Sequence, residues 1–243
     1  MTGILGIIQA RMGASRLPGK VLRPLGSTTV LGRVVAAARE SAAVADLVVA
    51  TTEEAEDDAV VAECARLRVA CHRGPTDDVL TRFLGALDAH PAGAVMRFTA
   101  DNPLQDPDII ATAARVFGAV PGLDYLSTSI AHTLPRGLDV EIISSSALRA
   151  LDDLATGHHR VHVTSYAYTH PETFRVLGLT VPPDRTHLRL TLDTVADWDL
   201  VRAVVAHVGD GTVNLPKLAE WLDAHPEIRA RNATVEQKAL EEA

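Results

Sequence analysis

Apolar residues in the first hundred positions fall into short runs separated by longer, helically spaced segments. The short runs are typical of buried strands and cover residues 4–8, 47–50, 69–72 and 95–99. Between them, residues 30–38 and 57–67 place apolar side chains three and four positions apart, which is typical of helices. Strands that alternate with helices predict βαβ units and a parallel sheet, so the pattern indicates an α/β fold.

The remaining chain continues this pattern with further helices and strands. Asp78, Asp106 and Thr194 are candidate N-caps, and Pro107 suits the first position of a helix. Predicted helices follow these caps and also cover residues 144–154 and 215–222. Predicted strands cover residues 123–127, 135–142, 174–181 and 187–192. We expect one α/β domain over residues 1–230, with a substrate and dimerisation subregion near 123–185 and a tail over 231–243.

Composition narrows the class of protein. The chain has 243 residues, 47% of them hydrophobic, which is enough for a sizeable core. A net charge of −8 argues against a nucleic-acid partner, because a phosphate backbone requires a basic face. The N-terminus lacks the pattern of a signal peptide, no run approaches the ~20 apolar residues that span a bilayer, and the two cysteines have no metal or redox spacing. We expect a soluble, cytoplasmic protein.

Residues 7–22 concentrate positive charge in a glycine-containing loop after the first strand. Arg11, Arg16 and Lys20 lie there, and no acidic residue precedes Glu40. Glycines allow backbone amides close to an anion while Arg and Lys neutralise it, so the loop suits a polyphosphate. The alternative is an ordinary strand-to-helix loop with exposed basic residues.

Two common phosphate motifs do not fit this loop. Gly13 is separated from Gly19-Lys20 by five residues and Val21 follows, whereas a Walker loop has four intervening residues and then Ser or Thr. Gly3 and Gly6 do not form the G-x-G-x-x-G fingerprint, which argues against a nicotinamide-dependent oxidoreductase.

Asp101 is a candidate metal ligand, and Asp193 has a similar place after a predicted strand. Asp101 follows the run 95–99, and Asp193 follows the run 187–192. A carboxylate just past a buried strand is a common Mg²⁺ ligand in phosphoryl-transfer sites, although Asp101 before Pro103 also fits a plain turn. His158 and His162 are spaced as zinc ligands would be on a helix, but no third ligand is evident.

The loop sequence I-Q-A-R-M-G-A-S-R-L-P-G-K-V-L resembles the signature of CMP-sugar-type cytidylyltransferases. The similarity is closest to the spore-coat polysaccharide branch, relatives of the acylneuraminate and Kdo enzymes, and Ala14 is its one departure in the loop. Later segments extend the resemblance: R-G-x-x-x-D-V-L at 73–80, G-L-D-V-E at 137–141 and R-L-T-L-D at 189–193. The resemblance implies a Rossmann-like nucleotidyltransferase fold, nucleotide-diphospho-sugar transferase-like, with three layers and a mostly parallel central sheet.

The resemblance also implies site roles. Catalytic residues would be Arg11, Lys20, Asp101 and Asp193, with both aspartates binding Mg²⁺. CTP would contact Gln9, Ala10, Arg11, Met12, Gly13, Arg16, Lys20, Arg73 and Asp78. The acceptor would contact Arg136, Asp139, Glu141, Arg160, His162 and Thr164. A homodimer is expected because the resembled family is usually dimeric.

The implied activity is Mg²⁺-dependent transfer of CMP from CTP to a sugar, sugar acid or similar small anionic acceptor, in polysaccharide or secondary-metabolite biosynthesis. Pyrophosphate is the second product of such a nucleotidyltransferase of the EC 2.7.7 type. The alternatives are a phosphonate cytidylyltransferase and a catalytically silent nucleotide-binding paralogue with a regulatory or assembly role. Ala100, Asn102 and Gln105 depart from the family pattern beside Asp101, and Val161 departs from it in the segment that would contact the acceptor. No general base is assigned.

Overall fold

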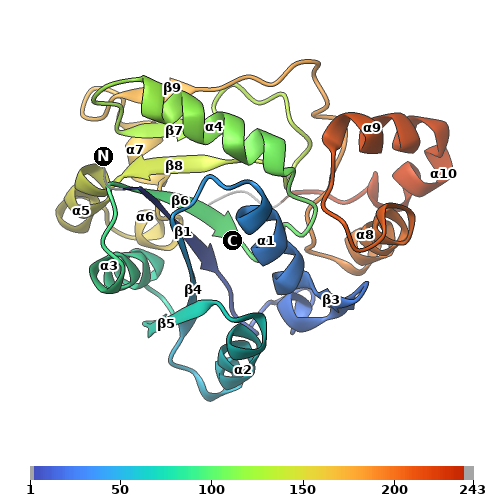
Figure 1. The fold of residues 1–243 in the computed structure, drawn as a ribbon, viewed down its shortest axis with the longest axis horizontal. Coiled ribbons are helices and arrows are strands. Elements are labelled where there is room, and N and C mark those ends of the chain that lie inside the picture. Colours follow the sequence, from blue (N-terminus) through green and yellow to red (C-terminus); the bar gives the residue numbers. More distant parts are fainter. Residues whose placement is uncertain (1–2, 238–243) are drawn as a thin grey trace.

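A seven-stranded sheet runs through the computed structural model, which describes residues 3–237 (Figure 1). In spatial order its strands are β5 (Ala70–Gly74), β4 (Asp46–Thr52), β1 (Ile4–Gln9), β6 (Ala94–Thr99), β8 (Glu141–Ser144), β7 (Tyr125–Ser127) and β9 (Val176–Gly178). The pairs β6–β8 and β7–β8 are antiparallel, and the other four pairs of this sheet are parallel. Only β8 runs against its neighbours, so the prediction of a mostly parallel central sheet is confirmed.

Helices cover both faces of this sheet and make three layers (Figure 1). One core includes α1 (Val30–Glu40), α2 (Asp58–Leu67), α4 (Pro107–Ala119), α8 (Val195–Val208) and α9 (Leu215–Ala224). The other includes α3 (Val79–Ala89), α5 (Ser145–Leu154) and α7 (Ser165–Thr169). Shorter elements are η1 (Lys20–Leu22), β2 (Pro24–Leu25), β3 (Thr28–Thr29), η2 (Ala55–Asp57), α6 (His158–Val161), α10 (Pro226–Arg229) and η3 (Ala230–Asn232).

The helix starts follow the caps predicted from the sequence. The side chain of Asp78 accepts a hydrogen bond from the backbone of Thr81 at the start of α3. Asp106 caps α4 with Pro107 in the first turn. Thr194 and Asp197 form the reciprocal capping box of α8. Local side-chain chemistry therefore sets these boundaries.

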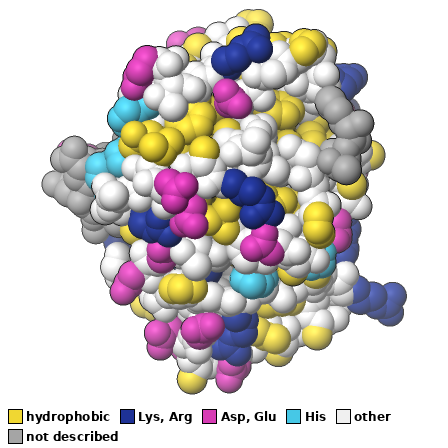
Figure 2. All heavy atoms as spheres, turned by 90° about the vertical axis from the view of Figure 1, so that its left-hand side faces the viewer, with side chains coloured by type: hydrophobic (Ala, Val, Ile, Leu, Met, Phe, Trp, Pro, Cys, Tyr) yellow, Lys and Arg dark blue, Asp and Glu magenta, His cyan; other side chains and the backbone are white. Residues whose placement is uncertain are grey.

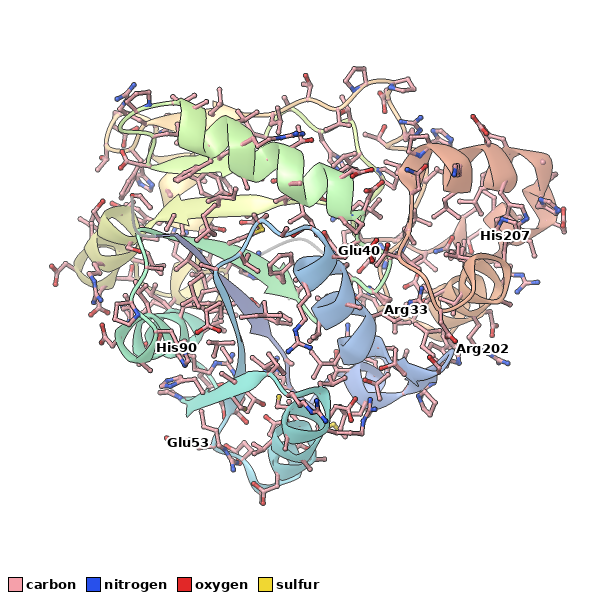
Figure 3. The ribbon with its side chains drawn as sticks, in the orientation of Figure 1. Arg33, Glu40, Glu53, His90, Arg202 and His207 are labelled. Atoms are coloured by element: carbon pink, nitrogen blue, oxygen red, sulfur yellow. The ribbon has the colours of Figure 1, made fainter. Side chains whose placement is uncertain are left out.

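The helices α8, α9 and α10 gather on one side of the molecule, beside α1 (Figure 1). Arg33 of α1 points toward this group (Figure 3) and donates hydrogen bonds to the carbonyls of Gly209 and Gly211, at 3.1 and 2.6 Å. Arg33 is buried, and these bonds satisfy its guanidinium. They attach the loop after α8 to the sheet domain.

Three predicted strands are shorter than expected or absent. Residues 135–142 form a strand only from Glu141, because Gly137 has a φ of 101° and cannot continue a ladder. Residues 187–192 contribute a single parallel bridge, between Arg136 and Arg189. Of residues 174–181, only Val176–Gly178 is a strand, because its partner β7 has three residues.

The predicted tail, residues 231–243, lies only partly within the described residues. Residues 231–237 of the predicted tail include the end of η3, and residues 238–243 lie outside the described part. None of the helices in residues 3–237 is long and apolar enough to cross a membrane. On the face shown in Figure 2, basic and acidic side chains are interspersed rather than gathered by sign.

Candidate active site

A cleft of about 930 Å³ opens beyond the carboxyl ends of β1 and β6. Ligands bind at this edge in open α/β sheets. Its walls come from the loop after β1, the turn before α3, the segment after β6, the stretch before β8, the α6–α7 region and the segment before α8. The sequence-predicted residues that line it are Gln9, Ala10, Arg11, Gly13, Arg16, Lys20, Asp101, Arg136, Asp139, Glu141, His162, Thr164 and Asp193.

Hydrogen bonds from two backbone amides hold the loop after β1 in shape. The amide of Gly19 donates to the carbonyl of Met12 at 3.0 Å, and the amide of Met12 donates to Asp57 at 2.6 Å. Gly19 has a φ of 66° and directly precedes η1, which begins at Lys20. This left-handed turn directs the Lys20 side chain into the cleft, where it is almost entirely buried.

Lys20 joins the two predicted metal-binding aspartates. Its Nζ lies 2.8 Å from Oδ2 of Asp101, 2.9 Å from Oδ1 of Asp193 and 2.8 Å from the carbonyl oxygen of Leu192. Burial alone would lower the pKa of Lys20, but the two carboxylates more than offset it and the pKa is raised. Burial acts to raise the pKa of Asp101, and Lys20 more than offsets this, so that pKa is lowered.

Asp193 has two further cationic partners. Arg16 lies 3.2 Å and Arg189 3.0 Å from its Oδ2. Arg189 also pairs with buried Asp197 at 2.8 Å, which joins the site to the capping box of α8. Sequence reasoning missed Arg189; its signal was a carboxylate four residues later, Asp193, in the segment 189–193.

Arg73 and Asp78, which the resemblance places in contact with CTP, do not line the cleft. Arg73 donates to Asp58 at 2.6 Å and to the carbonyl of Thr52 at 2.8 Å. Asp78 caps α3 and pairs with Arg160 at 2.7 Å, so Arg160 is also directed away from the cleft. Met12 likewise contributes no lining.

Thr76, Asp77, Val79 and Arg82 line this end of the cleft instead. None of them is among the predicted site residues, although Val79 is a matched position of the segment 73–80. The signal available was the position of Arg82, one helical turn after Asp78, on the apolar face of the predicted helix.

The other end of the cleft contains a buried ion pair. Arg97 of β6 donates to Glu141 of β8 at 2.5 Å and to the side chain of Gln9 at 3.0 Å. Glu141 also accepts hydrogen bonds from Tyr125, at 2.8 Å, and from Thr164. Burial acts to raise the pKa of Glu141, but Arg97 and these hydroxyls more than offset it and the pKa is lowered.

Asp139 precedes β8 and also faces the cleft. Its Oδ1 accepts from Thr128 at 3.3 Å and lies 3.4 Å from Nε2 of His132. Burial, with Glu141 adding to it, raises the pKa of Asp139. Asp139 and Glu141 therefore line one pocket, as predicted, although only Glu141 belongs to a strand.

Gln105 and Asn102, which differ from the cytidylyltransferase pattern, form hydrogen bonds beside this part of the cleft. Gln105 donates to the carbonyls of Gly137 and Asp139, at 3.2 and 3.3 Å. A side chain at Gly137 would meet the amide of Thr191 at 2.6 Å, so the two segments can approach only with glycine there. Asn102 donates to the side chain of Thr99 at 2.8 Å.

The zinc alternative for the histidine-rich segment has no support. Helix α6 is a single turn that ends at Val161, with His162 as its C-cap. Within residues 3–237, no group of three or more His, Cys, Asp and Glu side chains is arranged to hold a metal ion. A divalent ion between Asp101 and Asp193 would thus need further oxygen ligands from substrate or water.

Comparison with known proteins finds similarity to cytidylyltransferases. A family model described as cytidylyltransferase matches residues 5–206. The chain is 35% identical to the spore coat polysaccharide biosynthesis protein SpsF of Bacillus subtilis over 240 residues, 93% of this chain and 97% of that protein.

The chain is also similar in fold to solved structures. A cytidylyltransferase from Leptospira borgpetersenii superposes with a TM-score of 0.89 at 30% identity, covering 97% of this chain and 98% of that one. A CMP:2-keto-3-deoxy-manno-octonic acid synthetase complexed with CTP has a TM-score of 0.63 at 18% identity and covers 85% of this chain and 99% of its own, which is a likeness of fold.

Proposed function

The chain belongs to the cytidylyltransferase family, and we propose that it transfers CMP from CTP to a sugar or sugar-acid acceptor with release of pyrophosphate. The observation that carries the proposal is the contact of one lysine with two carboxylates inside the cleft. Lys20 comes from the basic loop, Asp101 follows β6, and Asp193 precedes α8. Three distant segments thus bring charges of both signs to one point.

The cations of the loop would bind and orient the triphosphate. Lys20, Arg16 and Arg11 line the cleft from one side and provide donors for phosphate oxygens. Charge that develops on the α-phosphate and on the leaving pyrophosphate is stabilised by such fixed cations. Catalysis of this kind depends on positioning and electrostatics, so no nucleophilic side chain of the protein is required.

Asp101 and Asp193 would hold Mg²⁺. Their oxygens lie within 3 Å of a single lysine nitrogen, so one small cation can be shared between them. Carboxylate oxygens are ligands that Mg²⁺ prefers, and it binds commonly through one or two carboxylates plus substrate phosphates. When bound, the ion supplies neutralisation of phosphate charge. The residues present therefore fit the metal.

The acceptor end of the cleft favours a molecule rich in hydroxyl groups. Ser129, Thr164 and Asp139 supply hydrogen-bonding groups, and Glu141 is already neutralised by Arg97. The name of the Bacillus subtilis relative supports an activated sugar used in polysaccharide biosynthesis. Arg136 also lines this end and favours, as a second candidate, an acceptor with a phosphonate group. The homodimer and the cytoplasmic location stay predictions.

The test is pyrophosphate release with Mg²⁺ and each of the four nucleoside triphosphates, against a panel of sugars, sugar acids and phosphonates. Release that needs both CTP and one sugar or sugar acid supports the proposal. Release with a phosphonate alone selects the second candidate. Tight CTP binding without any turnover on a broad panel would favour the silent paralogue.

A further inference from the structure

Asp139 is a carboxylate of the cleft that has no lysine or arginine partner. The carboxylates of Asp101, Asp193 and Glu141 each lie within 3 Å of a lysine or arginine nitrogen. Among residues 3–237, the only ion-pair partner within 4 Å of Asp139 is a histidine, and its side chain is 23% exposed. A carboxylate that stays without a fixed counter-ion inside a cleft is available to a bound molecule.

One oxygen of this carboxylate is directed to two groups of the same wall. The hydroxyl of buried Thr128 accepts from the amide of Val140 at 3.0 Å, so its proton is free for Oδ1 of Asp139 at 3.3 Å. Nε2 of His132 lies 3.4 Å from the same oxygen, is shielded from solvent and has no hydrogen-bond partner within residues 3–237. An approach of about 0.4 Å would make this contact a hydrogen bond. The other oxygen, Oδ2, accepts no hydrogen bond from the described part of the chain and is left for a ligand.

The charged groups around this pair make the carboxylate a better proton acceptor. Burial raises the pKa of Asp139, and Glu141 adds to the rise, whereas His132 and Arg136 act to lower it. Asp184 is a second acid close to His132. The net effect is a raised pKa, and a carboxyl whose pKa lies nearer to neutral pH accepts a proton more readily during a reaction.

The segment that carries Asp139 packs against the segment that ends at Asp193. Arg136 and Arg189 form a parallel bridge, and the amide of Leu190 donates to the carbonyl of Arg136 at 2.8 Å. From this bridge the two segments run in the same direction, to Asp139 on one and Asp193 on the other. Both side chains line the cleft. An acceptor that approaches a phosphate bound at Asp193 therefore meets Asp139 on the neighbouring segment.

The proposed reaction requires a group of this kind when the acceptor is a sugar. A sugar hydroxyl is a weak nucleophile while it keeps its proton, and a positioned base accelerates such a step by about 10²–10⁴-fold. Lys20 is unsuitable because its pKa is raised and it stays protonated. Glu141 is a weaker base because its pKa is lowered. Asp139 has the free oxygen, the raised pKa and the place in the cleft.

We propose that Asp139 is the general base of the cytidylyl transfer and that His132 positions it, an assignment that rests on the proposed function. The acceptor oxygen forms a bond to the α-phosphorus while its proton passes to Oδ2 of Asp139. The bond from the α-phosphorus to the bridging oxygen breaks, and its electron pair leaves with pyrophosphate. Asp139 then gives the proton to solvent.

The test measures kcat and KM with CTP, Mg²⁺ and the sugar or sugar acid of the panel that releases pyrophosphate fastest, from about pH 5 to about pH 9. Asp139→Asn keeps the size of the side chain and should lower kcat by about a hundredfold or more, with KM for CTP unchanged. The acidic limb of the kcat profile, where the wild type loses activity as its base is protonated, should be absent. Asp153→Asn is the matched control, because Asp153 is exposed on α5, and it should keep both the rate and the limb.

Two further variants separate catalysis from structural support. His132→Gln should lower kcat and move the acidic limb to higher pH, because His132 acts to lower the pKa of Asp139. A histidine that only supported the fold would change the rate without moving the limb. Asp139→Gly should regain activity when formate is added, since this small carboxylate can accept the proton in place of the missing side chain.

Other outcomes overturn the assignment and distinguish it from the function on which it rests. An acidic limb that persists in Asp139→Asn would assign the base to another group of the cleft, such as His162. A higher KM for the acceptor with an unchanged kcat would make Asp139 a binding residue. Turnover with a phosphonate alone would leave the transfer of CMP in place but remove the need for a base. If CTP supports no turnover with any acceptor, the proposed function fails and the assignment fails with it.

Discussion

Replacing Lys20 by methionine removes the cation that joins the two candidate metal ligands. The change deletes three contacts of one nitrogen, to Asp101, Asp193 and the carbonyl of Leu192. Methionine retains most of the buried stem, so packing is largely kept. What changes is the charge between the two carboxylates.

The magnitude follows from what each carboxylate retains. Breaking a buried ion pair by removing one partner costs about 3–5 kcal/mol. Asp193 keeps Arg16 and Arg189, and the Asp101 side chain is 28% exposed, so solvent and other cations reduce the penalty. We expect a loss near the lower limit, about 3 kcal/mol, or about 6–12 °C in Tm for a chain of this size.

The dependence on pH identifies the source of this loss. The pKa of folded Asp101 is lowered chiefly by Lys20, which offsets the effect of burial. A lowered carboxyl pKa contributes stability that is present above the unfolded value of about 3.9 and disappears as the pH falls through the folded value. The Tm difference between wild type and Lys20→Met should therefore be full at pH 7 and shrink below about pH 4.

Thermal unfolding at pH 7 and pH 3.5, with and without Mg²⁺, measures these effects. Lys217→Met is the matched control, because Lys217 is exposed on α9. Mg²⁺ should raise the Tm of Lys20→Met more than that of wild type, since the carboxylates no longer share a lysine. A Tm within 2 °C of wild type, or no effect of Mg²⁺, would refute the reasoning.

Three further predictions concern other residues of the cleft. Asp101→Asn and Asp193→Asn should each reduce Mg²⁺-dependent turnover at least a hundredfold while circular dichroism stays native; full activity in either would remove that residue from the metal site. Arg82 is buried, and its Nε and Nη1 have no hydrogen-bond partner among residues 3–237. Arg82→Met should therefore raise the Tm of the ligand-free protein by about 3 °C, because about 1 kcal/mol of unsatisfied donor cost disappears; a lower Tm would indicate a partner for this guanidinium. Glu141→Gln should make the stability of the protein less sensitive to acid. Because the pKa of Glu141 is lowered by folding, this carboxylate stabilises the fold above about pH 4.3, and that stabilisation is lost as the pH falls. Parallel profiles of Tm against pH for the two proteins would contradict this.

The first half of the fold follows closely from sequence patterns. The segments that became β1, β4 and β6 are largely apolar runs, as expected for strands buried on both faces, whereas β5 is a half-buried strand at the sheet edge. Caps such as Thr29 and Asp106 act within a few residues and can be identified without tertiary information.

The second half was harder to predict because period-two alternation is not specific to strands. In residues 135–142, Leu138 and Val140 are buried while Arg136 is exposed, yet Gly137 turns the backbone out of extended geometry. The segment alternates because it lies between the core and the cleft. Backbone conformation at one glycine decides this outcome, and hydrophobic spacing does not reveal it.

Site residues could be predicted where their place follows from the order of strands and loops along the chain. They were missed where their place depends on which side chains contact one another in the folded protein. The position of Asp101 follows from its place after β6, whereas Asp193 follows a predicted strand that forms only a single bridge, and its predicted role came from the resemblance. The pairing of Arg97 with Glu141 and the isolation of Arg82 depend on which side chains meet across the sheet and α3. Arg73 illustrates the converse, since its place at a strand end suggested the cleft, but Asp58 and nearby carbonyls hold it away.

The most direct test of the central claim follows the phosphorus atoms of CTP. The protein is incubated with Mg²⁺, an acceptor mixture and CTP labelled at either the α- or the γ-phosphate. The account predicts that the α-label moves into an acceptor-linked CMP product and that the γ-label leaves in pyrophosphate. Transfer of the γ-label to the acceptor, or hydrolysis of CTP without an acceptor-linked product, would contradict it.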